Sequence, residues 1–325
     1  MNNLLELDNL QTTFRTRDGD VHAVRGVSFH VQPGELVGIV GESGCGKSVT
    51  CKSIIQLLGS NGRITGGQIR FDNNDLAQKT PEQMRAIRGN QIAMIFQDPM
   101  TALNPVVTIG RQMSEILIRN KGLNKKAARA ASIAMLEQVG IAEAERRYDQ
   151  YPHEFSGGMR QRVMIAIALS CDPKLLIADE PTTALDVTIQ AQILRLLKSL
   201  QQKTPTAILL ITHDLGVVAQ VCSRVVVMYG GLVMEEGSVE DIFYRPAHPY
   251  TQGLLASLPH PEQTSHRLSP IEGSPPGLLN PPPGCPFAER CPQRMPQCDR
   301  QPAFYRPEPG HRAACWLLAD KEIQA

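Results

Sequence analysis

A glycine-rich segment, Gly41-Glu-Ser-Gly-Cys-Gly-Lys-Ser48, carries the clearest chemical signal in the chain. It fits the pattern G-x-x-x-x-G-K-[ST] between an expected strand and an expected helix, the context of a phosphate-binding loop. Glycines let successive amides turn toward phosphate oxygens, and a helix start adds positive partial charge. We expect Lys47 to reach the β- and γ-phosphates of a nucleotide and Ser48 to bind Mg²⁺. The residues predicted to contact the nucleotide are Gly41, Ser43, Gly44, Cys45, Gly46, Lys47, Ser48 and Val49.

A second chemical site is expected where an apolar strand ends in two carboxylates, in Leu175-Leu-Ile-Ala-Asp179-Glu180. A buried strand that ends in paired acids normally needs a cation or a proton beside it. Asp179 is therefore expected to hold Mg²⁺ through water, as the acid at a strand end does in phosphate-loop NTPases. Glu180 would polarise the attacking water as a general base. The alternative is an acid pair that caps a helix.

The segment Phe155-Ser-Gly-Gly-Met-Arg-Gln-Arg162 resembles the signature motif of ATP-binding cassette (ABC) proteins. It departs from the usual LSGGQ because Phe155 and Met159 replace Leu and Gln, but it keeps the Ser-Gly-Gly core. Other elements of the cassette occur in the order that this family requires. They are the aromatic residue Phe14, Gln97 in Phe96-Gln-Asp-Pro99, the segment Ala184-Leu-Asp186, and His213 after an apolar strand.

The resemblance implies roles in catalysis for Gln97 and His213 beside Glu180. Gln97 would contact Mg²⁺ and relay its state to a helical insertion, and His213 would contact the γ-phosphate. Phe14 would stack on adenine. Taken alone, a glutamine before Asp-Pro indicates a turn, a histidine after a strand indicates a loop edge, and a phenylalanine indicates core packing. The order of the motifs favours the catalytic interpretation for Gln97 and His213.

The resemblance also implies that two subunits share each ATP. Ser156, Gly157 and Gly158 precede an apolar helix, whose exposed amides suit the γ-phosphate of a nucleotide held by the opposite subunit. Asp186 would belong to the D-loop. We therefore expect a second ABC ATPase subunit as the partner. The resemblance favours a heterodimer over a homodimer.

The elements that must position these residues follow an α/β pattern up to about residue 245. Short apolar strands at 36–40, 92–96, 175–178 and 207–212 suit a parallel sheet covered on both faces. A hairpin is expected at 225–235, turning on Gly230–Gly231, and a helical insertion at about 108–148. The predicted fold class is α/β, an ABC-type phosphate-loop NTPase core at 1–245 with a helical subdomain at about 98–160. A Pro/Cys-rich extension is expected at 246–325, since it holds sixteen of the 24 prolines.

The extension resembles the C-terminal part of peptide and nickel importers, particularly of dipeptide permeases. The segments that carry this resemblance are 245–251, 254–259 and Gly284-Cys-Pro-Phe-Ala-Glu-Arg-Cys291. It implies an ATPase that powers import of di- or oligopeptides from the cytoplasmic face of the bacterial inner membrane. The implied partners are two transmembrane permease subunits and, indirectly, a periplasmic peptide-binding protein. Nickel and glutathione remain alternative cargoes.

Four cysteines of the extension, Cys285, Cys291, Cys298 and Cys315, predict a metal centre. A proline-rich segment with few large apolar residues gains stability from a metal. The intervals are wide for zinc and match neither ferredoxin pattern, so spacing does not choose the metal. The resemblance to peptide importers favours a [4Fe–4S] cluster with a structural role. Zinc and free thiols are the alternatives, and His311 is the reserve ligand.

Composition and sequence patterns argue against several other classes of protein. The formal net charge of +1 gives no electrostatic case for a nucleic-acid partner. The first ten residues do not fit a secretory signal, and no run of 18 apolar residues predicts a membrane span. A soluble ABC ATPase in DNA repair or translation is the alternative function. It is disfavoured because such proteins usually carry two cassettes or a coiled coil, and this sequence has one cassette and no heptads.

Overall fold

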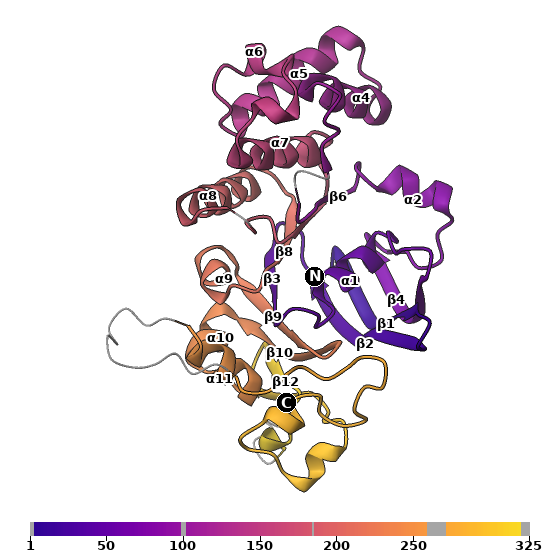
Figure 1. Ribbon diagram of the computed structural model, residues 1–325, viewed down its shortest axis with the longest axis vertical. Coiled ribbons are helices and arrows are strands. Elements are labelled where there is room, and N and C mark those ends of the chain that lie inside the picture. Colours follow the sequence, from indigo (N-terminus) through magenta and orange to yellow (C-terminus); the bar gives the residue numbers. More distant parts are fainter. Residues whose placement is uncertain (1–2, 99–101, 184, 259–270, 320–325) are drawn as a thin grey trace.

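The computed structural model describes residues 3–98, 102–183, 185–258 and 271–319 (Figure 1). Its main sheet has eight strands in the order β11-β12-β10-β9-β3-β8-β7-β6. The four central strands of the nucleotide-binding part are parallel, as the sequence predicted. Their bounds are Leu36–Val40 for β3, Ile92–Ile95 for β6, Leu175–Asp179 for β7 and Ala207–Ile211 for β8.

These strands are apolar along their whole length because both faces of the sheet are covered. Every residue of β3, β7 and β8 is buried. The carboxyl ends of parallel strands meet at one edge of the sheet, which brings the phosphate loop after β3 close to the acids that end β7. The helices that follow these strands are α1 at Lys47–Ile54, α8 at Val187–Lys203 and α9 at Leu215–Val221.

A second sheet, which the sequence analysis did not predict, has four antiparallel strands in the order β2-β1-β4-β5. One face of this sheet carries many polar residues. Its strands therefore alternate between buried and exposed positions and do not form continuous apolar runs. Their bounds are Leu5–Arg15 for β1, Asp20–Val31 for β2, Gly62–Phe71 for β4 and Asn74–Asp75 for β5. The short helix α2, Pro81–Ile87, follows this sheet.

A helical arm extends from one end of the molecule (Figure 1). The predicted insertion forms α4 at Ile109–Lys121, α5 at Lys125–Gln138 and α6 at Ala144–Tyr148, and the signature segment leads into α7 at Gly157–Leu169. Polar caps fix several of these ends: Asn124 accepts from Ala127 N before α5, and Ser156 accepts from Met159 N before α7. Among the described residues, no helix has the length and apolar character to cross a membrane.

The expected hairpin is formed by β9, Arg224–Tyr229, and β10, Leu232–Ser238. Helices α10, Val239–Tyr244, and α11, Pro249–Ala256, follow it. The chain then returns to the main sheet, since β12, His311–Ala313, pairs with β10 and with the edge strand β11, Tyr305–Glu308. No pattern in the sequence predicted this continuation of the sheet.

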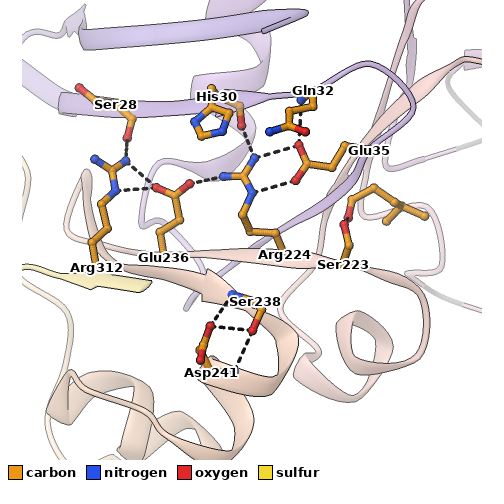
Figure 2. A network of polar contacts seen from close by, with 11 residues as sticks. Ser28, His30, Gln32, Glu35, Ser223, Arg224, Glu236, Ser238, Asp241 and Arg312 are labelled. Carbon is orange, nitrogen blue, oxygen red and sulfur yellow. Dashed lines mark hydrogen bonds and ion pairs between the residues drawn. The ribbon is translucent and has the colours of Figure 1, made fainter. Parts of the chain in front are cut away.

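An ion network fastens the returning strand to the nucleotide-binding part (Figure 2). Glu236 on β10 lies between Arg224 and Arg312, and Arg312 Nε donates to its Oε2 at 2.7 Å. Arg224 also donates to both carboxylate oxygens of Glu35, at 2.8 and 3.0 Å. Arg312 reaches the carbonyl of Ser28 on β2. The extension is therefore held against β10 and β2 by part-buried charge-assisted hydrogen bonds.

Candidate active site

The phosphate loop requires glycine at two positions for steric reasons. Gly41 has φ 150°, and a Cβ there would lie 2.1 Å from the carbonyl oxygen of Met228 on β9. Gly46 has φ 101°, and its Cβ would lie 2.5 Å from the carbonyl oxygen of Ala23 on β2. Both neighbours are backbone atoms, which cannot move away by a change of side-chain rotamer. The loop is thus pressed between the two sheets, in a conformation that only glycine adopts without strain.

Lys47 is buried within the loop and bound to it. Its Nζ donates to the carbonyl oxygens of Gly41 at 2.7 Å and of Glu42 at 2.9 Å. These neutral acceptors bind the ammonium group of a residue that is only 5% exposed. A triphosphate in the loop would offer Lys47 anionic oxygens instead, which form stronger charge-assisted hydrogen bonds.

Ser48 and Asp179 meet at the carboxyl edge of the sheet, although 131 residues separate them. Ser48 Oγ donates to Asp179 Oδ1 at 2.7 Å. Burial of Asp179 raises the pKa of its carboxyl, and the hydrogen bond from Ser48 opposes that shift. A hydroxyl and a carboxylate side by side are oxygen ligands of the kind that Mg²⁺ prefers. The pair therefore fits the Mg²⁺ site that the sequence predicted.

Glu180 is held in a defined orientation beside this pair. Its φ of 47° lies in the left-handed region, which is unusual for a residue with a Cβ. Gln97 Nε2 donates to Glu180 Oε2 at 2.9 Å, and Thr183 Oγ1 donates to the same oxygen at 2.8 Å. His213 Nδ1 lies 3.5 Å from the other oxygen, Oε1. The structure thus brings together the three residues that the sequence analysis named as catalytic.

The signature residues lie apart from this cluster, at the base of the helical arm. Gly158, in the first turn of α7, faces α8: a Cβ there would lie 2.7 Å from Ile189 Cγ2. Asp186 caps α8 by accepting from Ile189 N at 2.9 Å. Figure 1 shows α7, which the signature segment begins, beside the helical arm, and α1, which follows the phosphate loop, beside the antiparallel sheet. The neighbouring Ala184 lies outside the described residues.

Phe14, the predicted adenine platform, lies on β1 in the antiparallel sheet. It is half-buried, and its ring packs against Gly62 on β4, where an added Cβ would lie 2.6 Å from Phe14 Cε1. Its stacking role stays a prediction.

Two residues to which the sequence assigned no role also contact the phosphate loop, and both belong to the extension. Arg290 pairs with the carboxylate of Glu42, and Tyr250 Oη accepts a hydrogen bond from Glu42 N. Their partners lie 248 and 208 residues away in the sequence. Both residues lie in segments that carry the resemblance to peptide importers, 245–251 and 284–291, but no spacing rule links those segments to the phosphate loop.

The four cysteines of the extension gather around one small cavity, together with His248 and Trp316. Burial raises the pKa of the thiol of Cys285 to about 12 and that of Cys315 to about 11, and the nearby thiols add to both shifts. The cavity has a volume of about 10 Å³, room for one water molecule at most. The four donors therefore converge, but the space between them does not fit a four-iron cluster.

The metal expectation is consequently not supported by the side-chain arrangement. Within residues 3–98, 102–183, 185–258 and 271–319, no group of three or more His, Cys, Asp or Glu side chains is placed to hold a metal ion. All eight cysteines are free. His311, the reserve ligand, lies elsewhere: its Nε2 is 2.7 Å from Oε1 of the buried Glu235.

A phosphate loop, a Ser–Asp pair, an oriented glutamate and a signature helix on this α/β fold define an ABC ATPase. The family described as "ABC transporter" matches residues 24–183, and "Oligopeptide/dipeptide transporter, C-terminal region" matches residues 234–298. The chain belongs to the ABC transporter ATP-binding subunits that carry this C-terminal region.

Curated relatives match almost the whole chain. It is 56% identical to the dipeptide transport ATP-binding protein DppD of Bacillus subtilis, over 98% of this chain and 95% of that protein. It is 51% identical to the oligopeptide transport ATP-binding protein OppD of Salmonella typhimurium, over 97% of this chain and 94% of the relative.

Among solved structures, the ATP-binding cassette MJ0796, a dimer in a post-hydrolysis state bound to ADP and Pi, aligns with a TM-score of 0.65 and 28% identity. The alignment covers 72% of this chain and 98% of the other. It confirms the predicted ABC-type fold.

Proposed function

We propose that this chain hydrolyses ATP to power the import of di- or oligopeptides through a membrane transporter. The observation that supports this most directly is the cluster of Ser48, Asp179, Glu180 and Gln97 at the edge of the sheet, beside the phosphate loop. The assignment of peptides as the cargo rests on two findings: residues 234–298 match the C-terminal region of oligopeptide/dipeptide transporters, and the relatives are named as peptide transport proteins. This subunit lies at the cytoplasmic face of the inner membrane, bound to membrane subunits. Its nucleotide-binding domain spans residues 1–245, and its extension begins at 246.

Each residue of the cluster has a role that follows from its contacts. Lys47 and the loop amides bind the β- and γ-phosphates, and Ser48 and Asp179 hold Mg²⁺. Mg²⁺, when bound, neutralises charge on the phosphates. Glu180 accepts a proton from the attacking water, and the hydrogen bonds from Gln97 and Thr183 keep its Oε2 in place.

The opposite subunit completes the site. Ser156, Gly157 and Gly158 lie away from their own phosphate loop, so their amides serve the ATP of a partner. The partner is a second ABC ATPase, and the helical arm contacts the permease subunits. Asp186, at the start of α8, faces the same interface. ATP binding closes the dimer, and hydrolysis releases it.

The experiment that tests this function is reconstitution with the permease subunits and the second ATPase. The purified complex should take up a labelled dipeptide in the presence of ATP and a peptide-binding protein, with hydrolysis that rises with peptide. A complex that transports nickel or glutathione but no peptide would contradict the assignment of peptides as the cargo. A chain that fails to bind permease subunits would overturn the transport role.

A second, structural proposal is that the four cysteines hold a metal centre, either a [4Fe–4S] cluster or zinc, in an arrangement more open than the one described above. Thiolates are the donors that both centres use. Binding requires the thiols to move apart, because the cavity is small. Anaerobic purification followed by iron, sulfide and zinc analysis decides this. A folded protein without iron or zinc would remove the proposal.

A further inference from the structure

The extension reaches into the phosphate loop through one arginine. Arg290 is the last residue of a single turn of 3-10 helix, Ala288–Arg290, and pairs with both oxygens of the Glu42 carboxylate. Arg290 Nη1 lies 2.6 Å from Glu42 Oε2, and Nη2 lies 3.0 Å from Oε1. The arginine side chain is only 6% exposed. Bidentate pairing of this kind is strong and restricts the orientation of both side chains.

Arg290 is itself held in place by the surrounding chain. Its Nη1 also donates to Tyr229 Oη at 2.9 Å. Its Nε donates to the carbonyl of Glu272 at 2.8 Å, and its Nη2 to that of Ile271 at 3.0 Å. Every N–H of the guanidinium is thus used. A side chain ordered this completely loses little entropy when it holds Glu42.

A second group of the extension fixes the backbone of the same residue. Tyr250 on α11 is fully buried, and its Oη accepts from Glu42 N at 2.9 Å. In a trans peptide the N–H and C=O groups point in opposite directions, and the described residues contain no cis peptide. The N–H of the Gly41–Glu42 peptide faces Tyr250, so its carbonyl faces the other way, toward Lys47 Nζ at 2.7 Å. Tyr250 thereby sets the orientation of a peptide that contacts Lys47.

We propose that Arg290 and Tyr250 are positioning residues that hold the phosphate loop, through Glu42, in the conformation that binds ATP. The inference rests on the proposed ATPase function and adds a role for the extension within it. Arg290 also neutralises Glu42, whose negative charge would otherwise repel a triphosphate bound to the same loop. Both effects favour nucleotide binding, while the water-activating groups around Glu180 are untouched.

The test measures ATP affinity and turnover in the assembled complex. Tyr250→Phe removes one hydroxyl and keeps the buried ring, and Arg290→Gln removes the ion pair. We expect the ATP Kd to rise by about 3- to 10-fold for Tyr250→Phe and by about 5- to 50-fold for Arg290→Gln, with kcat at saturating ATP nearly unchanged. The control is Arg294→Gln, which breaks an exposed ion pair with Asp299 in the same extension. It should leave the ATP Kd unchanged.

A double-mutant cycle separates positioning from general loss of stability. If Arg290 acts through Glu42, then Glu42→Gln combined with Arg290→Gln should weaken ATP binding less than the two single effects combined. Additive effects, or an unchanged Kd in Tyr250→Phe, would overturn the inference. If Arg290→Gln fails to fold, Tyr250→Phe alone decides. A wild-type complex that binds no ATP would instead overturn the proposed function, so the two failures are distinguishable.

Discussion

Replacing Glu236 with glutamine should loosen the attachment of the extension to the nucleotide-binding part. Glu236 is the shared acceptor of Arg224 and Arg312, whose side chains are 14% and 26% exposed. Glutamine keeps the shape of the side chain but offers no charge and only one acceptor oxygen. One of the two arginines must then face an amide NH₂ group in place of a carboxylate.

The size of the effect follows from what each arginine retains. Breaking a buried ion pair costs about 3–5 kcal/mol when the remaining charge is left without a partner. Arg224 keeps both oxygens of Glu35, and Arg312 keeps the carbonyl of Ser28 and some contact with solvent. We therefore expect the free energy of unfolding to fall by about 2–3 kcal/mol. With an unfolding entropy of about 2.1 cal/mol/K per residue, or about 0.7 kcal/mol/K for this chain, the Tm falls by roughly 3–4 °C.

Differential scanning calorimetry of the full-length protein checks this value. The matched control is Glu289→Gln, the same chemical change at an exposed position of the extension. Its effect should stay within about 0.5 kcal/mol. If the two variants melted at the same temperature, the carboxylate of Glu236 would contribute nothing measurable to the attachment of the extension.

Three further predictions concern the nucleotide. Lys47→Ala should raise the ATP Kd by at least about 10-fold, because an ammonium group set against phosphates is lost; Lys203→Ala, at the end of α8, is the control in the same nucleotide titration. Gly46→Ala should abolish ATP binding, because the new Cβ would lie 2.5 Å from the carbonyl oxygen of Ala23. Binding of ATP at wild-type affinity would show that the loop tolerates a side chain at this position. The isolated chain should hydrolyse ATP slowly and be stimulated by the second ATPase and the permease subunits; high turnover by a monomer in light-scattering analysis would contradict the shared site.

The sequence was sufficient where local patterns dictate structure. The apolar runs at 36–40 and 207–212 became buried parallel strands, because runs of this kind suit a sheet covered on both faces. The phosphate loop and the acids that end β7 meet because parallel strands share a carboxyl edge. The second sheet was missed because its strands are only partly apolar, as in Gly62–Phe71.

Contacts between distant segments could not be predicted in this way. The pairing of Arg290 with Glu42 depends on the tertiary path of the extension, which no spacing rule encodes. The same holds for β12, three residues long, which pairs with β10 where Arg312 lies opposite Glu236. The cysteines were correctly singled out as a group, since they line one cavity, but their spacing did not reveal how tightly they pack.

The central claim is that the acids at the end of β7 make this chain an ATP hydrolase with Glu180 as the general base. The most direct measurement is the ATPase rate of the assembled complex with Glu180→Gln, together with its ATP Kd. Glutamine keeps the size of the side chain, and its one carbonyl oxygen can still accept hydrogen bonds from Gln97 and Thr183. It cannot accept the proton of water. We predict an unchanged ATP Kd and a rate lowered by roughly 10²–10⁴-fold. Hydrolysis near the wild-type rate would contradict the account.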